Sequence, residues 1–248
     1  MRSPALALAF LVLGASAVLI AVLMGGGAAV APAWFALSYG SVGVAYLGRP
    51  GLVFGKDRVT GRIPFLRKVL LFPYLVTTAG LWHVLRLLGR ERPYARMAPG
   101  LYVGRRLLSR EYPAGIRTVV DLTFELDARR PLDPGVSYEN IPVLDGACLS
   151  PTELRDVGAR VATLRQPIYL HCAQGHGRTA MVAASVLLAL GLAESAERAL
   201  EDILAARPGA RTNHAQRSAA LALTAAIPGG AAPLTSGSAR GAAPRALV

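Results

Sequence analysis

The chain has 248 residues, of which 53% are hydrophobic, and its formal net charge at pH 7 is +12. This hydrophobic share is too high for an ordinary soluble domain. Nearly all of the positive charge is arginine, and no basic surface interleaved with aromatic residues accompanies it, so we expect no nucleic-acid partner. The charge instead predicts orientation in a membrane, attraction to anionic lipid, or docking of an anionic substrate.

Two uncharged apolar segments open the chain. Residues Pro4 to Met24 and Ala28 to Leu47 flank a run of three glycines. Each segment is about 20 residues long, the length that spans the hydrocarbon core of a bilayer. We therefore expect a transmembrane hairpin over residues 1–48. A cleaved signal peptide is the alternative for the first segment, but its apolar run exceeds the usual core of about 7–15 residues and a second span follows at once.

Residues 49–97 are basic at both ends and apolar in between, from Val69 to Leu88. The positive-inside rule favours both basic ends on the cytoplasmic side of the membrane. An interfacial or re-entrant helix meets that condition and is the preferred interpretation. A third span, which would put the two ends on opposite sides, is the alternative. We expect a multi-pass membrane protein with the rest of the chain in the cytoplasm.

From residue 98 to residue 227 the pattern is that of a compact α/β domain. Strands are expected over Leu101–Gly104, Ile116–Leu122, Tyr138–Leu144 and Pro167–Leu170. Ser150 is a good N-cap for a helix that starts at Pro151, carries Glu153 at its third position and ends near Leu164. Strands that alternate with helices predict a central, mainly parallel sheet flanked by helices. Residues 228–248 are rich in Gly, Ala, Ser and Pro, which predicts a disordered tail.

The segment His171–Thr179 reads HCAQGHGRT and lies between the last expected strand and an apolar helix from Thr179 to about Leu190. A strand, a tight loop and a helix N-terminus together form an anion site, because loop N–H groups point inward and the helix dipole favours negative charge. Gly175 and Gly177 allow the positive φ angles that such a loop needs. Arg178 can bind two phosphate oxygens at once.

These residue types suit phosphate-ester hydrolysis. Cys172 would lie beneath the phosphorus, and both the helix N-terminus and Arg178 should lower the pKa of its thiol. The thiolate could then attack phosphorus and form a phosphocysteine intermediate. Thr179 could donate a hydrogen bond to the sulfur and help it leave when water hydrolyses the intermediate. This chemistry needs no metal or organic cofactor, and no cluster of His and Cys suggests a metal site.

With this Cys-x5-Arg motif the chain resembles the protein-tyrosine/dual-specificity phosphatase superfamily, over roughly Gly100 to Ala225. The resemblance implies a phosphoric monoester hydrolase with a dual-specificity-phosphatase-like α/β domain. It implies that Asp145, on a loop after a strand, is the general acid, and that His171 orients the phosphate-binding loop from behind. The loop residues expected at the substrate are Ala173, Gln174, Gly175, His176 and Gly177.

Several alternatives stay open at this stage. Asp145 precedes a glycine and could simply form a turn, with Asp127 and Asp133 as weaker candidates for the acid. Ala180 stands where the family commonly has Gly or Ser. The segment from Arg207 to Asn213, followed by Gln216, resembles the last loop and helix of the family.

Only two cysteines occur, Cys148 and Cys172. A nucleophilic cysteine must stay reduced, which fits a catalytic domain in the cytoplasm. Cys148 is interpreted as a small apolar residue, with reversible oxidation against Cys172 as the alternative.

A phosphorylated protein is the preferred substrate. A phospholipid-headgroup phosphatase, such as a phosphatidylglycerophosphate phosphatase, is the alternative that the membrane hairpin favours. Relatives that act on lipids often carry Lys or Arg within the loop, whereas this chain has Ala173 and His176. A catalytically weak module that only binds phosphate is a third interpretation.

Overall fold

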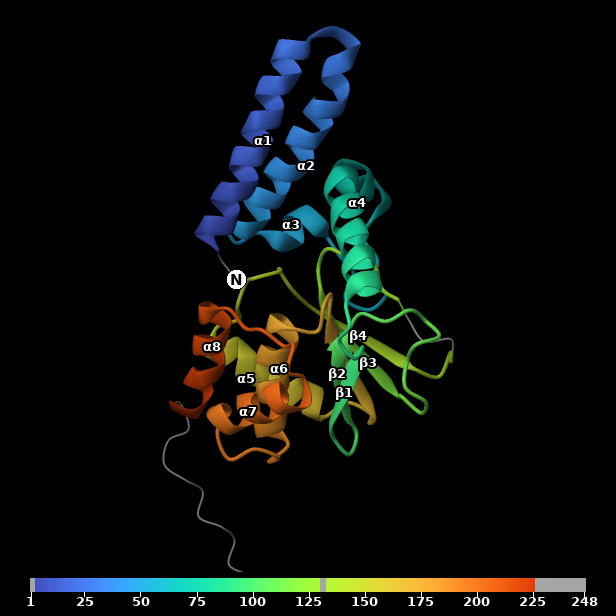
Figure 1. The fold of residues 1–248 in the computed structure, drawn as a ribbon, viewed down its shortest axis with the longest axis vertical. Helices are drawn as coiled ribbons and strands as arrows, with labels where there is room; N and C mark the ends of the chain where they lie inside the picture. The colour runs from blue at the N-terminus through green and yellow to red at the C-terminus, as the bar shows by residue number, and fades with distance from the viewer. Residues whose placement is uncertain (1–2, 130–132, 226–248) are drawn as a thin grey trace, which may run out of the picture.

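The computed structural model describes residues 3–129 and 133–225. Two long helices form a hairpin that projects from an α/β body (Figure 1). They are α1 (Pro4–Met24) and α2 (Val30–Tyr46), joined by the short 3-10 helix η1 (Gly26–Ala29). The predicted tail from 228 to 248 lies outside the described residues.

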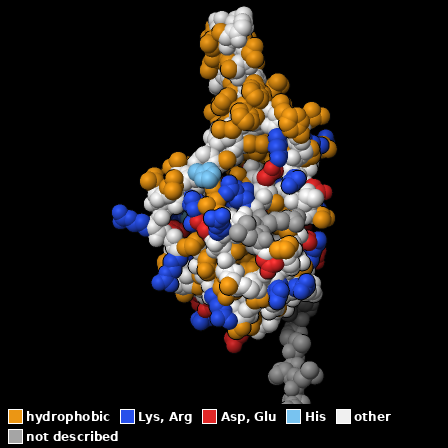
Figure 2. Space-filling model, turned by 90° about the vertical axis from the view of Figure 1, so that its right-hand side faces the viewer, with side chains coloured by type: hydrophobic (Ala, Val, Ile, Leu, Met, Phe, Trp, Pro, Cys, Tyr) orange, Lys and Arg blue, Asp and Glu red, His pale blue; other side chains and the backbone are white. Residues whose placement is uncertain are grey.

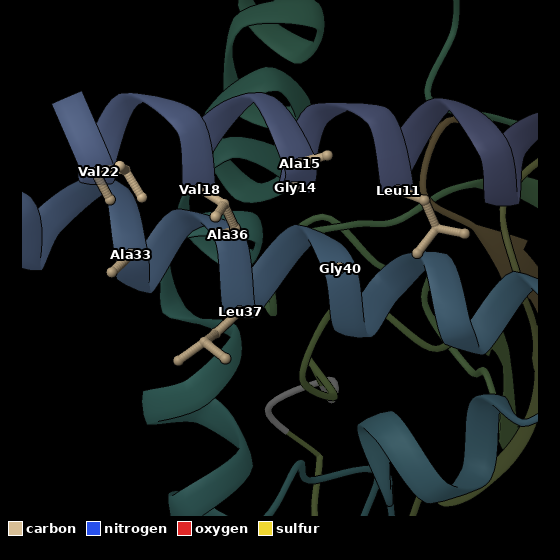
Figure 3. Close-up of a pocket in the computed structure, with 10 residues that line it drawn as sticks. Leu11, Gly14, Ala15, Val18, Val22, Ala33, Ala36, Leu37 and Gly40 are labelled. Atoms are coloured by element: carbon tan, nitrogen blue, oxygen red, sulfur yellow. The ribbon is translucent and has the colours of Figure 1, made fainter.

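Glycines bring α1 and α2 close together. A Cβ atom on Gly14 would lie 3.1 Å from the backbone nitrogen of Gly40, and one on Gly43 would lie 2.7 Å from the side chain of Leu11. Small residues at a helix contact are typical of membrane helix pairs, where van der Waals packing drives association. Figure 3 shows the shallow groove of about 620 Å³ between the two helices, lined by small and aliphatic side chains. Hydrophobic side chains cover the projecting hairpin, whereas charged ones gather on the body (Figure 2).

A third long helix, α4 (Phe65–Leu88), follows the short α3 (Pro50–Phe54). Three helical segments are long and apolar enough to span a membrane: Pro4–Met24, Gly26–Tyr46 and Phe65–Leu88. By length and composition α4 therefore meets the requirement of a third span, the alternative to the interfacial helix. It packs beside α2, where the indole of Trp34 donates to the carbonyl of Val69 at 2.9 Å. Its last turns lie against the body (Figure 1).

The body is built on a five-stranded sheet in the order β1-β2-β5-β3-β4. The strands are β1 (Tyr94–Ala98), β2 (Leu101–Arg105), β3 (Thr118–Thr123), β4 (Ser137–Val143) and β5 (Ile168–Cys172). The four strands from β2 to β4 pair in parallel, and only β1 is antiparallel to its neighbour. The predicted mainly parallel sheet is thus confirmed. Strand β1 was not predicted. It lies at the edge of the sheet, where its exposed Arg96 suits an edge strand, and most of it falls in residues 49–97, the segment assigned to the membrane surface.

Four helices cover the sheet: α5 (Pro151–Ala162), α6 (Gly177–Ala189), α7 (Ala196–Ala206) and α8 (His214–Ala225). The capping box predicted for α5 is present, because the Ser150 hydroxyl accepts from the Glu153 N–H and the Ser150 N–H donates to the Glu153 carboxylate. Helix α6 is buried along most of its length, among α5, α7 and α8 (Figure 1). The N-terminus of this helix fixes the end of the loop that follows β5.

One lysine of the basic segment is a buried counter-ion. The ammonium of Lys56 lies 2.9 Å from Asp121 of β3 and donates to the carbonyl of Thr123 at 2.7 Å. Burial alone would raise the pKa of Asp121, but the charge of Lys56, with His171 and the Tyr138 hydroxyl, holds it well below its usual range. Lys56 is therefore not available to a membrane surface, contrary to its grouping with the other basic residues of residues 49–97.

We predict that Lys56→Met destabilises the body by about 3–5 kcal/mol at pH 7, because Asp121 would be left buried and unpaired. The folded-state pKa of Asp121 is lowered, so the stability from its charge is present above its unfolded pKa of about 3.9 and is lost as the pH falls. Urea denaturation of the full chain in detergent at pH 7 and at about pH 2.5, below the unfolded pKa of Asp121, measures both effects. The matched control is Lys68→Met, because the Lys68–Asp127 pair is more than a third exposed on both sides. An equal loss in both variants would contradict the assignment.

Candidate active site

The loop between β5 and α6 places the predicted cysteine at the floor of a pocket. Cys172 ends β5, α6 begins at Gly177, and the thiol side chain is 3% exposed. Gly175 has φ +74°, and a Cβ atom on it would lie 2.3 Å from the carbonyl carbon of Gly104 in β2, so only glycine fits there. The Gly175 N–H donates to the Cys172 sulfur at 3.3 Å. The loop thus fixes the position of the sulfur beside the N-terminus of α6.

Arg178 is held rigidly by groups that precede the loop in sequence. Its two terminal nitrogens lie 3.0 and 2.7 Å from the two carboxylate oxygens of Glu125, and one of them also donates to the carbonyl of Val143 at 2.9 Å. Asp145 is 3.0 Å from the same guanidinium. Burial alone would lower the pKa of Arg178, but Glu125 and Asp145 raise it well above its ordinary value. The guanidinium is therefore permanently charged and fixed in orientation.

Glu125 is the site residue that the sequence analysis missed. It follows β3 directly after Phe124 and is almost completely buried. The available signal was its place: the ends of parallel strands β3 and β5 meet at one edge of the sheet, so an acidic residue after β3 lies near the loop after β5. Asp127 and Asp133, the weaker candidates for the acid, are not among the residues that line the pocket. The Asp127 carboxylate accepts from the Ile63 N–H, and the Asp133 carboxylate accepts from the Gly135 N–H.

Asp145 lies at the opposite wall of the pocket, with 74% of its side chain exposed. Its loop is anchored by backbone contacts. The Tyr46 hydroxyl, from the last residue of α2, donates to the Asp145 carbonyl at 2.8 Å. The Asn213 amide donates to the Gly146 carbonyl at 2.8 Å. The exposed carboxylate faces the pocket and contacts Arg178, while its backbone is fixed from two sides.

The pocket has a volume of about 420 Å³ and joins three segments of the chain. Its lining consists of Asp145, Gly146, Cys172, Ala173, Gln174, His176, Gly177, Arg178, Arg211, Thr212, Asn213 and Gln216. The segment before α8, which resembles the last loop of the family, thus forms part of the wall. All loop residues expected at the substrate line it except Gly175, which faces β2.

The remaining predicted residues lie around the loop. The Thr179 hydroxyl, in the first turn of α6, is buried and has no hydrogen-bond partner within residues 3–129 and 133–225. His171 is buried beneath the loop, with its Nδ1 atom 3.2 Å from the Cys172 carbonyl. Burial lowers the pKa of His171 more than nearby Asp121 raises it, so the ring is neutral near pH 7. His176 stands on the rim, with Nε2 2.9 Å from the Glu91 carboxylate.

The sequence of the domain that holds this pocket matches a protein-family model over part of its length. Residues 107–192 match the family model described as "Tc-R-P: Polymorphic toxin system, DSP-PTPase phosphatase". The chain carries a phosphatase domain of the protein-tyrosine/dual-specificity superfamily. The enzyme is accordingly a phosphoric monoester hydrolase. No curated protein matches the chain.

Solved structures resemble the phosphatase domain at low sequence identity. Tk-PTP in its active form is 23% identical over 54% of this chain and 98% of its own, with a TM-score of 0.45. Human DUSP28 is 24% identical over 54% of this chain and 95% of its own, with a TM-score of 0.45. PTPMT1 is 18% identical over 53% of this chain and 94% of its own, with a TM-score of 0.44.

The hydrogen bond from Tyr46 of the hairpin to the Asp145 backbone gives a testable effect. We predict that Tyr46→Phe lowers kcat by about three- to tenfold, because a hydrogen bond of roughly 0.5–1.5 kcal/mol that fixes the Asp145 backbone is lost. The loss should be larger for substrates with poor leaving groups, which depend most on a positioned acid. Steady-state kinetics on a series of aryl phosphates measure it. Tyr39→Phe is the matched control. It also removes a hydroxyl from α2, but that hydroxyl donates to the Thr77 side chain.

Proposed function

We propose that this protein is a membrane-anchored phosphatase that hydrolyses phosphomonoesters through a phosphocysteine intermediate, with Cys172 as the nucleophile. The observation that carries the proposal is the arrangement of a buried thiol, a rigid guanidinium and an exposed carboxylate around one pocket. The Gly175 N–H donates to the Cys172 sulfur, which lies near the N-terminus of α6, where the helix dipole favours negative charge. Arg178 would bind two phosphate oxygens from the position that Glu125 fixes.

In the first proposed step, the Cys172 sulfur forms a bond to phosphorus as the bond to the leaving oxygen breaks. Asp145 gives its proton to that oxygen, so the alcohol or phenol departs neutral. In the second step, water attacks phosphorus, the S–P bond breaks, and the Asp145 carboxylate takes the proton from water. The products are inorganic phosphate, the Cys172 thiolate and the protonated acid. The unpartnered hydroxyl of Thr179 would donate to the sulfur as it leaves.

A phosphorylated protein, as in the dual-specificity type, is the substrate class that we propose first. The hydrolytic loop itself offers no Lys or Arg besides Arg178. A second candidate is the headgroup of a phospholipid, because Tyr46 at the end of the hairpin touches the acid loop and so ties the pocket to the base of the apolar helices. A membrane location with the domain in the cytoplasm is part of the proposal, in keeping with the two free cysteines.

The experiment that tests the proposal measures phosphate release by the full chain in detergent at pH 5 to 7. The substrates are a phosphotyrosine peptide, a phosphoserine peptide and phosphatidylglycerophosphate. Cys148→Ser is the matched cysteine control, because Cys148 lies outside the pocket lining. Release that survives in this control and favours a peptide supports the protein substrate. Preference for the lipid would move the proposal to the second candidate, and no release from any substrate would contradict the enzyme mechanism.

A further inference from the structure

A second cavity lies directly beside the catalytic pocket and has no part in the proposed reaction. Its volume is about 280 Å³, and it shares Gln174 and His176 with the catalytic pocket as a common wall. It is bounded by the end of α4, the segment before β1, the end of β2 and the turn after α7. Its charged lining residues are Arg86, Arg90, Glu91, Arg92, Arg105 and Arg207.

The positive charge of this cavity is mostly uncompensated. Arg86 pairs with Glu111, at 2.5 Å. Arg90, Arg92 and Arg105 form no ion pair with any residue in the described ranges 3–129 and 133–225. Glu91 contributes the opposite charge, and its carboxylate lies 2.9 Å from His176 Nε2 and 3.9 Å from a terminal nitrogen of Arg207. An anion in the cavity would relieve the mutual repulsion of the arginines.

Two of the arginines are built into the protein rather than displayed on its surface. The side chain of Arg207 is 4% exposed, one of its terminal nitrogens donates to the Arg92 carbonyl at 3.2 Å, and its Nε atom has no partner among the described residues. In Arg105 the Nη1 atom is buried and likewise has no partner there. A buried donor without a partner destabilises the folded protein. Two such donors beside one cavity therefore point to a ligand that accepts hydrogen bonds from them.

The second cavity lies close to the expected position of the reacting phosphate, above Cys172. Arg105 of β2 and Cys172 of β5 are register partners on neighbouring strands, whose axes are about 4.8 Å apart. Gln174 and His176 line both cavities. Leu85 of α4 lines the second cavity, and Leu88, one turn further along the helix, is exposed. A ligand that fills both cavities must therefore be short between its two anionic groups.

We propose that this cavity is a second anion subsite, which binds a second phosphate carried on the same small headgroup as the phosphate that Cys172 removes. The proposal rests on the proposed phosphatase reaction and favours its second substrate candidate over a phosphorylated protein, as a bisphosphorylated headgroup that is either free or part of a phospholipid. Arg105 and Arg207 would bind the second phosphate from the buried side, and Arg90 and Arg92 from the solvent side. The headgroup linker would cross the wall formed by Gln174 and His176.

The test compares matched substrates with one and two phosphates, using the full chain in detergent. The soluble pair is glycerol 3-phosphate and glycerol 1,3-bisphosphate, and the lipid pair is phosphatidic acid and phosphatidylglycerophosphate in mixed micelles. We expect kcat/KM to be at least about tenfold higher for the second member of a pair, and Arg105→Gln to reduce that ratio by about tenfold. Arg96→Gln, an equal charge change at an exposed position of β1 outside the cavity, should leave the ratio unchanged.

Preference in both pairs identifies the headgroup as the ligand, and preference in the lipid pair alone adds a requirement for acyl chains; both support the subsite. Equal kcat/KM within each pair, or a ratio that Arg105→Gln does not change, would overturn it. So would an Arg105-dependent preference shown only by a doubly phosphorylated peptide. Calorimetry measures how tightly the Cys172→Ser variant binds each member of a pair, without turnover. Failure of the subsite is therefore distinguishable from failure of the catalytic proposal.

Discussion

Cys172→Ser is expected to lower kcat by about 10⁴-fold or more, the scale of effect when a catalytic nucleophile is removed. A serine hydroxyl at this position would have no base to take its proton, and it is a weaker nucleophile than the cysteine sulfur. The loop N–H groups and Arg178 remain in place in the variant. Affinity for inorganic phosphate should therefore stay within about threefold of the original value, measured by calorimetry on the detergent-solubilised chain.

The same prediction has a direct chemical readout. Rapid acid quench of the unsubstituted protein during turnover should leave a phosphoryl group on the peptide that contains Cys172, detected by mass spectrometry. Cys148→Ser should give the same labelled peptide and nearly the same rate, because Cys148 does not line the pocket. Comparable slow hydrolysis by the unsubstituted protein and by Cys172→Ser would instead indicate a module that binds phosphate without cleaving its ester.

The phosphate-binding loop was predictable from sequence because its parts are contiguous. A strand, a glycine-containing loop and a helix start occur together within residues 168–189, and each residue type has a physical reason for its place. The caps of α5 and the parallel strands were predictable on the same ground, since local propensity and hydrophobic pattern determine them. The hairpin was predicted from the length and low polarity of its two segments. Both segments are among the three helices of the described residues that are long and apolar enough to span a membrane.

The supports of the loop were not predictable, because they come from distant parts of the chain. Glu125 is 53 positions from Arg178, Lys56 is 65 positions from Asp121, and Tyr46 is 99 positions from Asp145. No local pattern reports such pairs; they exist only once the sheet and the hairpin are assembled. Single carboxylates and lysines outside a motif look alike in sequence, so a buried counter-ion such as Lys56 was grouped with surface charge.

The arginines show the same limit in a different way. Composition predicted roles at the membrane surface and at an anionic substrate. In the structure, Arg178 and Arg207 are buried in or beside the two cavities, and Arg106 stacks on the indole of Trp82 with its guanidinium carbon 5.3 Å from the ring centroid. Trp82 in turn donates to the Ala173 carbonyl of the phosphate-binding loop. Part of the basic charge therefore builds the site itself, and α4 reaches the loop through one indole.

Asp145→Asn is expected to lower kcat by about 10²- to 10⁴-fold for phosphate esters of alcohols, the usual contribution of a general acid. The amide cannot supply a proton, so the leaving oxygen must depart as an anion. Esters with a good leaving group, such as dinitrophenol, need little protonation and should lose less than about tenfold. A plot of log kcat against leaving-group pKa should thus become steeper in the variant. Arg178 keeps its two contacts with Glu125, so phosphate binding should persist.

Asp133→Asn is the matched control, because Asp133 was a competing candidate for the acid and its carboxylate accepts from the Gly135 N–H in its own turn. We expect its leaving-group dependence to equal that of the unsubstituted protein. A steeper leaving-group dependence in Asp133→Asn than in Asp145→Asn would move the acid to the other loop. Since Tyr46→Phe should change the same slope in the same direction but by less, agreement between the two variants would link the membrane hairpin to the proton-transfer step itself.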